Sequence, residues 1–274
     1  MTLDWSAAPK APLVVNGVRL EYACHGPRPD DAPTIVLLHE GLGCVALWRD
    51  FPARLAERTG LGVFVYSRQG YGKSDPVRLP RPLDFMTREA QDVLPHVLDA
   101  AGLRRVILFG HSDGATIAAI HAGSVSDARV RGLVLMAPHF FTEPSGLAEI
   151  EKARVAYNTT DLRDRLAKYH DDPDGAFKGW NRCWLDPDFR SWNVAEVIDY
   201  FRVPVLAIQG RQDQYGTLAQ IEEIETRAYS PVETAILDDC RHAPHLEQPE
   251  ATLAAVADFT ARLMRIEAAE VVPA

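Results

Sequence analysis

Five consecutive residues, Gly110 to Gly114, constrain the fold of this chain more than any other stretch. They read Gly-His-Ser-Asp-Gly, and they lie between an apolar run at 106–109 and an alanine-rich run at 115–120. A strand, a sharp turn and a helix are therefore expected in that order. In the Gly-x-Ser-x-Gly pattern the two glycines leave room for a serine in a strained backbone conformation at the end of a strand. This pattern predicts a nucleophilic side chain at Ser112.

The same alternation of apolar runs and helical patterns extends along most of the chain. A hairpin is expected around Asn16-Gly17, with strands at 13–15 and 18–22. Further strands are predicted at 34–38, 62–66, 106–109, 130–136, 205–208 and 234–237. Helices are predicted from residue 47 to 58, 85 to 101, 113 to about 123, 217 to 228 and 249 to about 266, followed by a frayed tail at 267–274. Strands that alternate with helices predict an α/β fold with a mostly parallel, doubly wound sheet.

One segment, residues 139–201, interrupts this alternation. It contains no convincing strand, shows several short helical patterns and holds three of the five tryptophans, Trp180, Trp184 and Trp192. Because it lies between two predicted strands, we expect it to fold over the carboxyl edge of the sheet.

Two later strand ends carry the residues that a serine nucleophile needs. A serine hydroxyl reacts only when a base removes its proton, and a third group must orient that base. Asp213 follows the strand at 205–208, and His242 follows the strand at 234–237. Asp213 could instead cap the next helix, and His245 competes with His242 for the role of base.

Taken together, these motifs resemble those of the α/β-hydrolase family. The resemblance rests on His39-Glu40-Gly41, on the 68–74 stretch Arg-Gln-Gly-Tyr-Gly-Lys-Ser, on the serine turn, on the acid turn and on the histidine loop. It implies that Ser112 is the nucleophile, Asp213 the acid and His242 the base. His242 matches the Gly-His-x-Pro pattern of the family except that Arg241 replaces the glycine. The resemblance also implies a core of residues 1–138 and 202–274, with 139–201 as a helical cap.

The same resemblance implies an oxyanion hole made by two main-chain amides. One is the amide of Asp113, which follows the nucleophile. The other belongs to the loop after the first buried strand, where we assign Gly41, with Leu42 as the alternative. His39 and His111 are expected to be structural residues that bond to loops.

Glu40 departs from the family pattern, which usually reads His-Gly at this place. If Glu40 faces the site, it and Asp113 place two carboxylates near the nucleophile and disfavour anionic substrates. In the alternative, Glu40 forms a salt bridge with Arg68 or Arg241; this alternative is the favoured one.

Substrate contacts are expected from the loop after the first buried strand and from the cap. Glu40 and Leu42 are candidates in the loop, His139 directly follows a strand end, and Trp180 and Trp184 share one helical pattern. Tryptophans at this spacing also serve simply as packing residues.

The predicted reaction is hydrolysis of a carboxylic ester or lactone of a small, neutral substrate through an acyl-enzyme. One alternative is a carbon–carbon hydrolase of ring-cleavage products, whose substrates are anionic. A second alternative is a hydrolase fold without catalysis that serves as a ligand receptor. No metal or cofactor is expected, because the sequence contains neither a His-Glu-x-x-His pattern nor a Gly-x-Gly-x-x-Gly pattern after a strand.

Composition limits the partners and the compartment. The net charge of -9 argues against nucleic acids and anionic membranes as partners. The four cysteines have neither metal-ligand nor disulfide-framework spacing, and the first residues lack the pattern of a signal peptide. We therefore expect a cytoplasmic protein that acts on a small molecule; its oligomeric state is left open.

Overall fold

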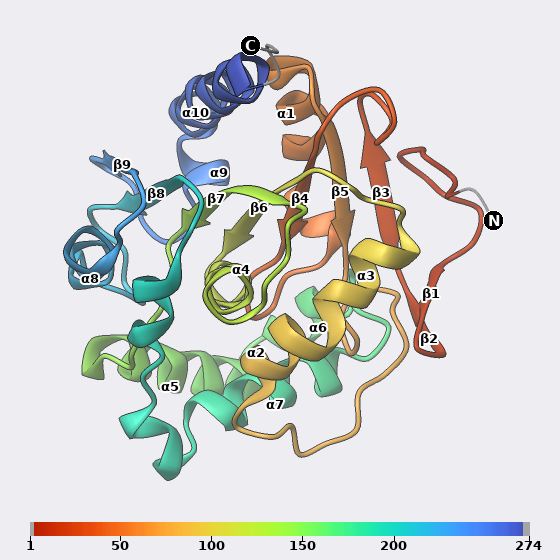
Figure 1. Cartoon of the computed structure of the whole chain (residues 1–274). Coiled ribbons are helices and arrows are strands. Elements are labelled where there is room, and N and C mark those ends of the chain that lie inside the picture. Colours follow the sequence, from red (N-terminus) through yellow and green to blue (C-terminus); the bar gives the residue numbers. More distant parts are fainter. Residues whose placement is uncertain (1–2, 271–274) are drawn as a thin grey trace.

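The computed structural model describes residues 3–270, which are built around a sheet of seven strands (Figure 1). The strand order is β3-β5-β4-β6-β7-β8-β9, and every pair is parallel except β3 with β5. The strands span Tyr22–His25 (β3), Thr34–Leu38 (β4), Gly62–Tyr66 (β5), Val106–His111 (β6), Val130–Met136 (β7), Val205–Gly210 (β8) and Val232–Leu237 (β9). This arrangement confirms the predicted α/β fold.

Helices cover both faces of the sheet (Figure 1). On one face lie α1 (Phe51–Thr59) and α10 (Pro249–Glu270), and on the other lie α3 (Leu94–Ala100), α4 (Asp113–Ser124) and α8 (Ala219–Arg227). Central strand β6 alternates between the two cores: Ile107 and Phe109 pack with the first pair of helices, and Val106 and Leu108 with the second group. A strand buried on both faces needs this continuous apolar run.

The predicted N-terminal hairpin forms a separate two-stranded sheet of β1 (Leu13–Val15) and β2 (Val18–Leu20). The predicted strand at 18–22 is divided at Glu21, and Tyr22 begins β3 in the main sheet. Hydrogen bonds explain the division, because the Glu21 amide binds the Ser74 hydroxyl and the Glu21 carbonyl binds the Ser67 amide. Glu21 is thereby tied to the loop that follows β5.

Two predicted helices are interrupted near a proline. The helix expected from residue 47 to 58 consists of a 3-10 turn, η1 (Val45–Trp48), and α1, separated by Arg49 at φ 54°. Pro52 lies in the first turn of α1, where a missing amide hydrogen costs little. The helix expected at 85–101 divides into α2 (Phe85–Arg88), a π-helical turn η2 (Glu89–Val93) and α3, with Pro95 in the first turn of α3. The π turn accommodates the hydrogen bond that Pro95 cannot donate.

The last helix is longer than predicted. It continues to Glu270, so the residues from 267 to 270 are helical and the expectation of a tail starting at Glu267 is wrong. The rest of that predicted tail, 271–274, lies outside the described residues.

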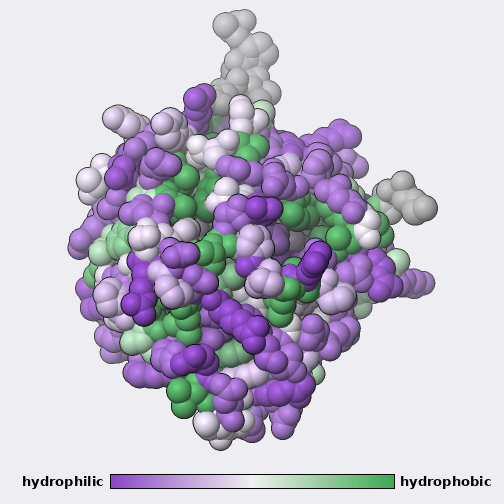
Figure 2. Space-filling view, turned by 90° about the horizontal axis from the view of Figure 1, so that it is seen from below, coloured by the Kyte–Doolittle hydropathy of each residue, from purple (hydrophilic) through white to green (hydrophobic). Residues whose placement is uncertain are grey.

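Between β7 and β8 the chain forms only helices and turns, with one isolated bridge between Phe141 and Asn193. The elements are α5 (Pro144–Thr159), α6 (Leu162–Leu166), α7 (Pro173–Trp184), η3 (Pro187–Ser191) and η4 (Ala195–Tyr200). Helices α5 and α7 lie together at the lower end of the molecule in Figure 1. Seen from that end, hydrophilic residues cover most of the surface and hydrophobic ones are scattered among them (Figure 2). Within residues 3–270, none of the helices has both the length and the apolarity to cross a membrane.

Candidate active site

The turn between β6 and α4 holds Ser112 in a backbone conformation that few residues other than glycine adopt. Its φ is 54° and its ψ is -121°. The Ser112 amide donates to the carbonyl of Met136 on β7, and the Ser112 carbonyl accepts from the amides of Ala115 and Thr116 in α4. The strained residue is therefore fixed between a strand and a helix, as a preorganised functional group requires.

The two glycines of the turn are required by close backbone approach. A Cβ atom on Gly114 would lie 2.0 Å from the carbonyl oxygen of Leu38, and one on Gly110 would lie 2.2 Å from the carbonyl oxygen of Gly114. Both distances are far below contact distance, and in both cases the obstacle is backbone. Substituting either glycine would displace β4 or the start of α4, and with it Ser112.

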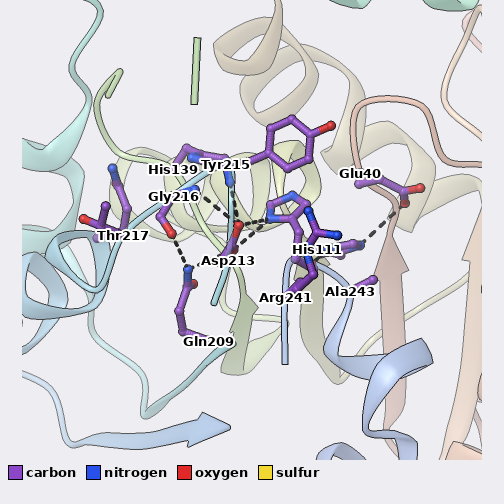
Figure 3. A network of polar contacts seen from close by, with 12 residues as sticks. Glu40, His111, His139, Gln209, Asp213, Tyr215, Gly216, Thr217, Arg241 and Ala243 are labelled. Atoms are coloured by element: carbon purple, nitrogen blue, oxygen red, sulfur yellow. Dashed lines mark hydrogen bonds and ion pairs between the residues drawn. The ribbon is translucent and has the colours of Figure 1, made fainter. Parts of the chain in front are cut away.

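The structure brings the predicted acid and base together. Nδ1 of His242 lies 2.8 Å from Oδ2 of Asp213. The Asp213 carboxylate is buried, and it also accepts from the Gln209 side chain and from the amides of Tyr215 and Gly216 (Figure 3). Burial alone would raise the pKa of Asp213, but the adjacent His242 and these donors hold it below its ordinary value. An ionised carboxylate on Nδ1 keeps that proton in place and leaves Nε2 available to accept a proton.

The competing histidine lies elsewhere. His245 is buried against Trp48 and Phe51, with ring centroids 4.8 and 5.6 Å away. Burial lowers its pKa to about 3, so its ring is neutral. His245 is not among the residues that line the cavity next to Ser112, whereas His242 is.

The loop after β4, which carries Glu40 and Gly41, is held from beneath by Arg68. The guanidinium of Arg68 donates to the carbonyls of His39 and Glu40, and its amide donates to Nε2 of His39. The other ring nitrogen of His39 donates to the Glu40 carbonyl at 2.7 Å. Both nitrogens of His39 are thus used to shape the loop, which agrees with the structural role expected for it.

Helix α7 packs directly on this loop. A Cβ atom on Gly41 would lie 2.2 Å from the indole nitrogen of Trp180. Four residues further along α7, the indole of Trp184 donates to Oδ1 of Asp113 at 3.2 Å. The two tryptophans therefore reach the two residues whose amides are candidates for the oxyanion hole. Because Asp113 is the first residue of α4, its amide hydrogen has no acceptor within the helix.

The carboxylate of Asp113 is buried, and one of its two oxygens lacks a hydrogen bond within residues 3–270. Its exposed fraction is 1%, and its Oδ2 atom has no hydrogen-bond partner among the described residues. Burial raises the pKa of Asp113 to about 6, although the nearby guanidinium of Arg68 partly opposes the rise. At neutral pH the folded protein thus carries the cost of ionising a poorly solvated group.

The cost of ionising buried Asp113 leads to a prediction for the stability of Asp113→Asn. Because the folded-state pKa is raised, the stabilising effect of the protonated group is present at low pH and lost as the pH rises through about 6. The asparagine variant lacks the ionisation cost, so we expect its unfolding free energy at pH 8 to exceed that of the wild type by about 1–3 kcal/mol. Near pH 4.5 most of the difference should vanish. Denaturant unfolding at the two pH values measures it, with exposed Asp258→Asn as the control; an equal gain at both pH values would contradict the explanation.

The expected salt bridge between Glu40 and Arg68 or Arg241 is wrong. Arg68 binds the main-chain carbonyl of Glu40, whereas Oε2 of the Glu40 carboxylate lies 3.6 Å from Nδ1 of His111 (Figure 3). Burial alone would raise the pKa of Glu40, but the proximity of the His111 ring holds it well below its ordinary value. Glu40 also lines the cavity at Ser112, which is the first of the two positions expected for it.

The predicted residues gather around one cavity of about 100 Å³. Its lining includes nearly all the predicted site residues: Glu40, Gly41, Leu42, Ser112, Asp113, His139, Trp180, Trp184 and His242. Asp213 lies behind His242 instead. Among the described residues, those that line the cavity include no lysine or arginine.

Sequence reasoning missed several lining residues, which are Glu143, Gly146, Leu147, Ile150 and Tyr215. Four of them belong to α5 or directly precede it, where the weakly amphipathic pattern does not show which face is covered. Tyr215 follows Asp213 by two residues, and its ring centroid lies 4.8 Å from that of His242. Its position two residues after the acid was a usable signal. Within residues 3–270, no group of three or more His, Cys, Asp or Glu residues is arranged to hold a metal ion.

Comparison with known proteins identifies the architecture. The model of the "Alpha/beta hydrolase family" matches residues 35–256, and no curated protein matches the chain. An enol-lactonase from Burkholderia xenovorans superposes with a TM-score of 0.70 at 21% identity over 90% of this chain and 98% of that one. An esterase from Thermogutta terrifontis gives 0.72 at 15% identity over 93% and 99%. A meta-cleavage product hydrolase from Pseudomonas fluorescens gives 0.71 at 21% identity over 93% and 98%. At these identities the superpositions show a shared fold.

Proposed function

The chain belongs to the alpha/beta hydrolase family, and we propose that it hydrolyses a carboxylic ester or lactone of a small, neutral substrate through an acyl-enzyme on Ser112. One observation carries this proposal. The Asp213 carboxylate binds Nδ1 of His242 at 2.8 Å, and His242 and Ser112 line the same cavity. A nucleophile, a base and an orienting acid are the three groups that acyl transfer by serine requires.

In the first stage Ser112 Oγ attacks the carbonyl carbon while Nε2 of His242 accepts the hydroxyl proton. The amides of Asp113 and Gly41 stabilise the negative charge on the carbonyl oxygen. His242 then returns the proton to the leaving alcohol, and the acyl group remains on Ser112. In the second stage a water molecule, activated by His242, attacks the acyl-enzyme and releases the acid. Asp213 stays ionised and stabilises the imidazolium in both stages.

The cavity supports a small substrate without negative charge. Its volume of about 100 Å³ is below the roughly 300–1,000 Å³ of typical ligand pockets. Glu40, Asp113 and Glu143 contribute carboxylates to the lining, and no lysine or arginine of the described residues does. An anionic ring-cleavage product would therefore lack a counter-ion, which places carbon–carbon hydrolysis second. Trp180, Trp184 and Tyr215 offer aromatic surface to an apolar acyl or alcohol group.

A serine-directed fluorophosphonate probe tests the proposal. We expect the probe to label the wild-type protein at Ser112 and to leave Ser112→Ala unlabelled. A panel of neutral esters, lactones and one ring-cleavage dienoate then separates the reaction classes. Equal labelling of wild type and Ser112→Ala would contradict the proposed serine hydrolase and favour a ligand receptor. Faster turnover of the dienoate than of every ester and lactone would favour carbon–carbon hydrolysis.

Replacing Glu40 with glutamine tests the electrostatic part of the substrate proposal. The substitution keeps the shape of the side chain and removes one negative charge from the cavity lining. We expect kcat/KM for an acidic ester to rise about five-fold relative to a matched neutral ester, equivalent to roughly 1 kcal/mol. The measurement is the ratio of the two kcat/KM values in wild type and variant. An unchanged ratio would contradict a role for Glu40 in excluding anions.

A further inference from the structure

A chain of polar contacts joins three loops of the site without taking part in the proposed chemistry. It starts at Glu40 in the loop after β4, passes through His111 at the end of β6 and ends at the main chain of His242. Oε2 of Glu40 lies 3.6 Å from Nδ1 of His111, and Nε2 of His111 lies 2.7 Å from the carbonyl oxygen of His242. Figure 3 shows Glu40 and His111 beside the Asp213 network. The chain therefore touches the loops of the oxyanion hole, the nucleophile and the base.

The proton positions on His111 follow from its two neighbours. A carbonyl oxygen only accepts hydrogen bonds, so Nε2 of His111 carries a proton. If Nδ1 were bare, its lone pair would face the Glu40 carboxylate, and two acceptors would oppose each other in a ring that is 3% exposed. At 3.6 Å the two groups are in contact without forming a hydrogen bond, so the Glu40 carboxylate acts on the orientation of the ring through its charge.

Three other rings surround His111. The rings of His245, His242 and Trp48 lie 5.0, 5.1 and 6.3 Å from His111, centroid to centroid. His245 is neutral, since burial lowers its pKa to about 3. Glu40 is the carboxylate next to the ring, and Asp213 lies on the far side of His242.

The main chain of the loop that carries His242 makes one further set of hydrogen bonds. Glu247 accepts hydrogen bonds from the amides of Arg241 and Ala243, which flank His242. That carboxylate ties the loop to the short helix α9 (Pro244–Glu247), within the same C-terminal segment. The bond from His111 instead ties the loop to β6, the strand that carries the nucleophile. It therefore joins the loop of the base to the strand that ends just before Ser112.

We propose that Glu40 and His111 form a positioning pair for the base, in which Glu40 orients the His111 ring and the ring holds the His242 main chain in register with Ser112. This inference rests on the proposed function. His242 is then held at its side chain by Asp213 and at its main chain by His111. Neither residue of the pair touches the reacting atoms, so both are positioning residues. Loss of His111, which does not line the cavity, should lower kcat and leave KM nearly unchanged, because substrate binding does not depend on the proton transfer.

A double-mutant cycle tests the pair. His111→Phe keeps an aromatic ring and removes both nitrogens, and Glu40→Met keeps the length of the side chain and removes the carboxylate. We expect each single variant to lower the rate of Ser112 labelling by a fluorophosphonate, and kcat for a neutral ester, about ten-fold, because small misplacements of catalytic groups cost up to about 10²-fold. The double variant should lose no more than His111→Phe alone, since coupled residues are not additive. KM of His111→Phe should stay within about two-fold of the wild-type value.

Two conservative variants separate positioning from packing. His111→Gln retains a side-chain donor for the His242 carbonyl, and Glu40→Gln can donate to a neutral Nδ1; both should recover most of the labelling rate. His245→Leu alters the same aromatic cluster without touching the chain, and it should label nearly as fast as wild type. Because the Glu40 side chain is 28% exposed, the two Glu40 variants should fold even if His111→Phe does not, and their comparison alone decides the question.

The outcomes separate this inference from the proposed function. If wild type is labelled at Ser112 and Glu40→Met reacts at the wild-type rate, the positioning pair is overturned and the serine hydrolase stands. Strictly multiplicative losses in the double variant, or an equal loss in His245→Leu, would also overturn it. If wild type is not labelled at all, the proposed function fails and the inference falls with it.

Discussion

Replacing Ser112 with alanine is expected to lower kcat/KM by about 10⁴–10⁶-fold. The substitution removes the atom that forms the acyl-enzyme, so His242 and Asp213 have nothing to activate. The residual rate should come from direct attack of water on the bound substrate, assisted by the oxyanion amides. Alanine has no volume to add at φ 54°, so the fold should be retained.

The measurement is kcat/KM for the best neutral ester, together with the unfolding midpoint of each protein. Ser124→Ala is a matched control, because Ser124 ends the same helix α4 and is exposed. We expect this control to be indistinguishable from wild type. Loss of activity by less than ten-fold in Ser112→Ala, with a saturable ester still turned over, would show that the nucleophile lies elsewhere.

His242→Ala is expected to slow acylation about 10⁴–10⁶-fold, whereas His245→Ala should retain acylation within about ten-fold. Of these two histidines, His242 is the one that is bound by an ionised carboxylate on Nδ1 and borders the cavity at Ser112. His245 packs against Trp48 in the core, so its replacement leaves a cavity and reduces stability. The two variants should therefore show opposite defects. His242→Ala should lose acylation and keep the wild-type unfolding midpoint. His245→Ala should have a lower unfolding midpoint and keep acylation.

Single-turnover kinetics with a chromogenic ester measure the acylation rate, and thermal unfolding measures the midpoint. Both variants should be compared at a temperature where His245→Ala is still folded. Acylation near the wild-type rate in His242→Ala would overturn the assignment of the base.

The fold was predictable from sequence because its strands are continuous apolar runs. Such runs as Thr34–Leu38 and Gly62–Tyr66 can only be accommodated inside a sheet covered on both faces. The places where prediction failed depend on contacts that are distant in sequence. Glu21 ends a strand because Ser67 and Ser74 bind its main chain. The contact could not be read from residues 18–22 alone.

The candidate site was likewise predictable where it follows from strand order and unpredictable where it depends on distant contacts. The order of Ser112, Asp213 and His242 at three strand ends was readable, since parallel strands bring their carboxyl ends to one edge. The partner of Glu40 was not, because a nearby arginine is the natural expectation for a carboxylate. Arg68 is near, but its guanidinium is engaged with main-chain carbonyls, and the carboxylate meets His111 instead. Which of several donors a buried group takes depends on loop geometry that no spacing rule contains.

The contact between Gly41 and Trp180 has a consequence for exchanging parts between hydrolases. The indole occupies the space that a side chain at position 41 would need. A cap transplanted from a relative would bring a different residue to that point, and any gap or overlap would be transmitted to the loop that is expected to bind the oxyanion. Recombination of this core with foreign caps should therefore succeed when residues 39–43 are transferred together with the cap, and lose turnover when the cap is transferred alone. The unit of exchange in such chimeras is the cap with its underlying loop.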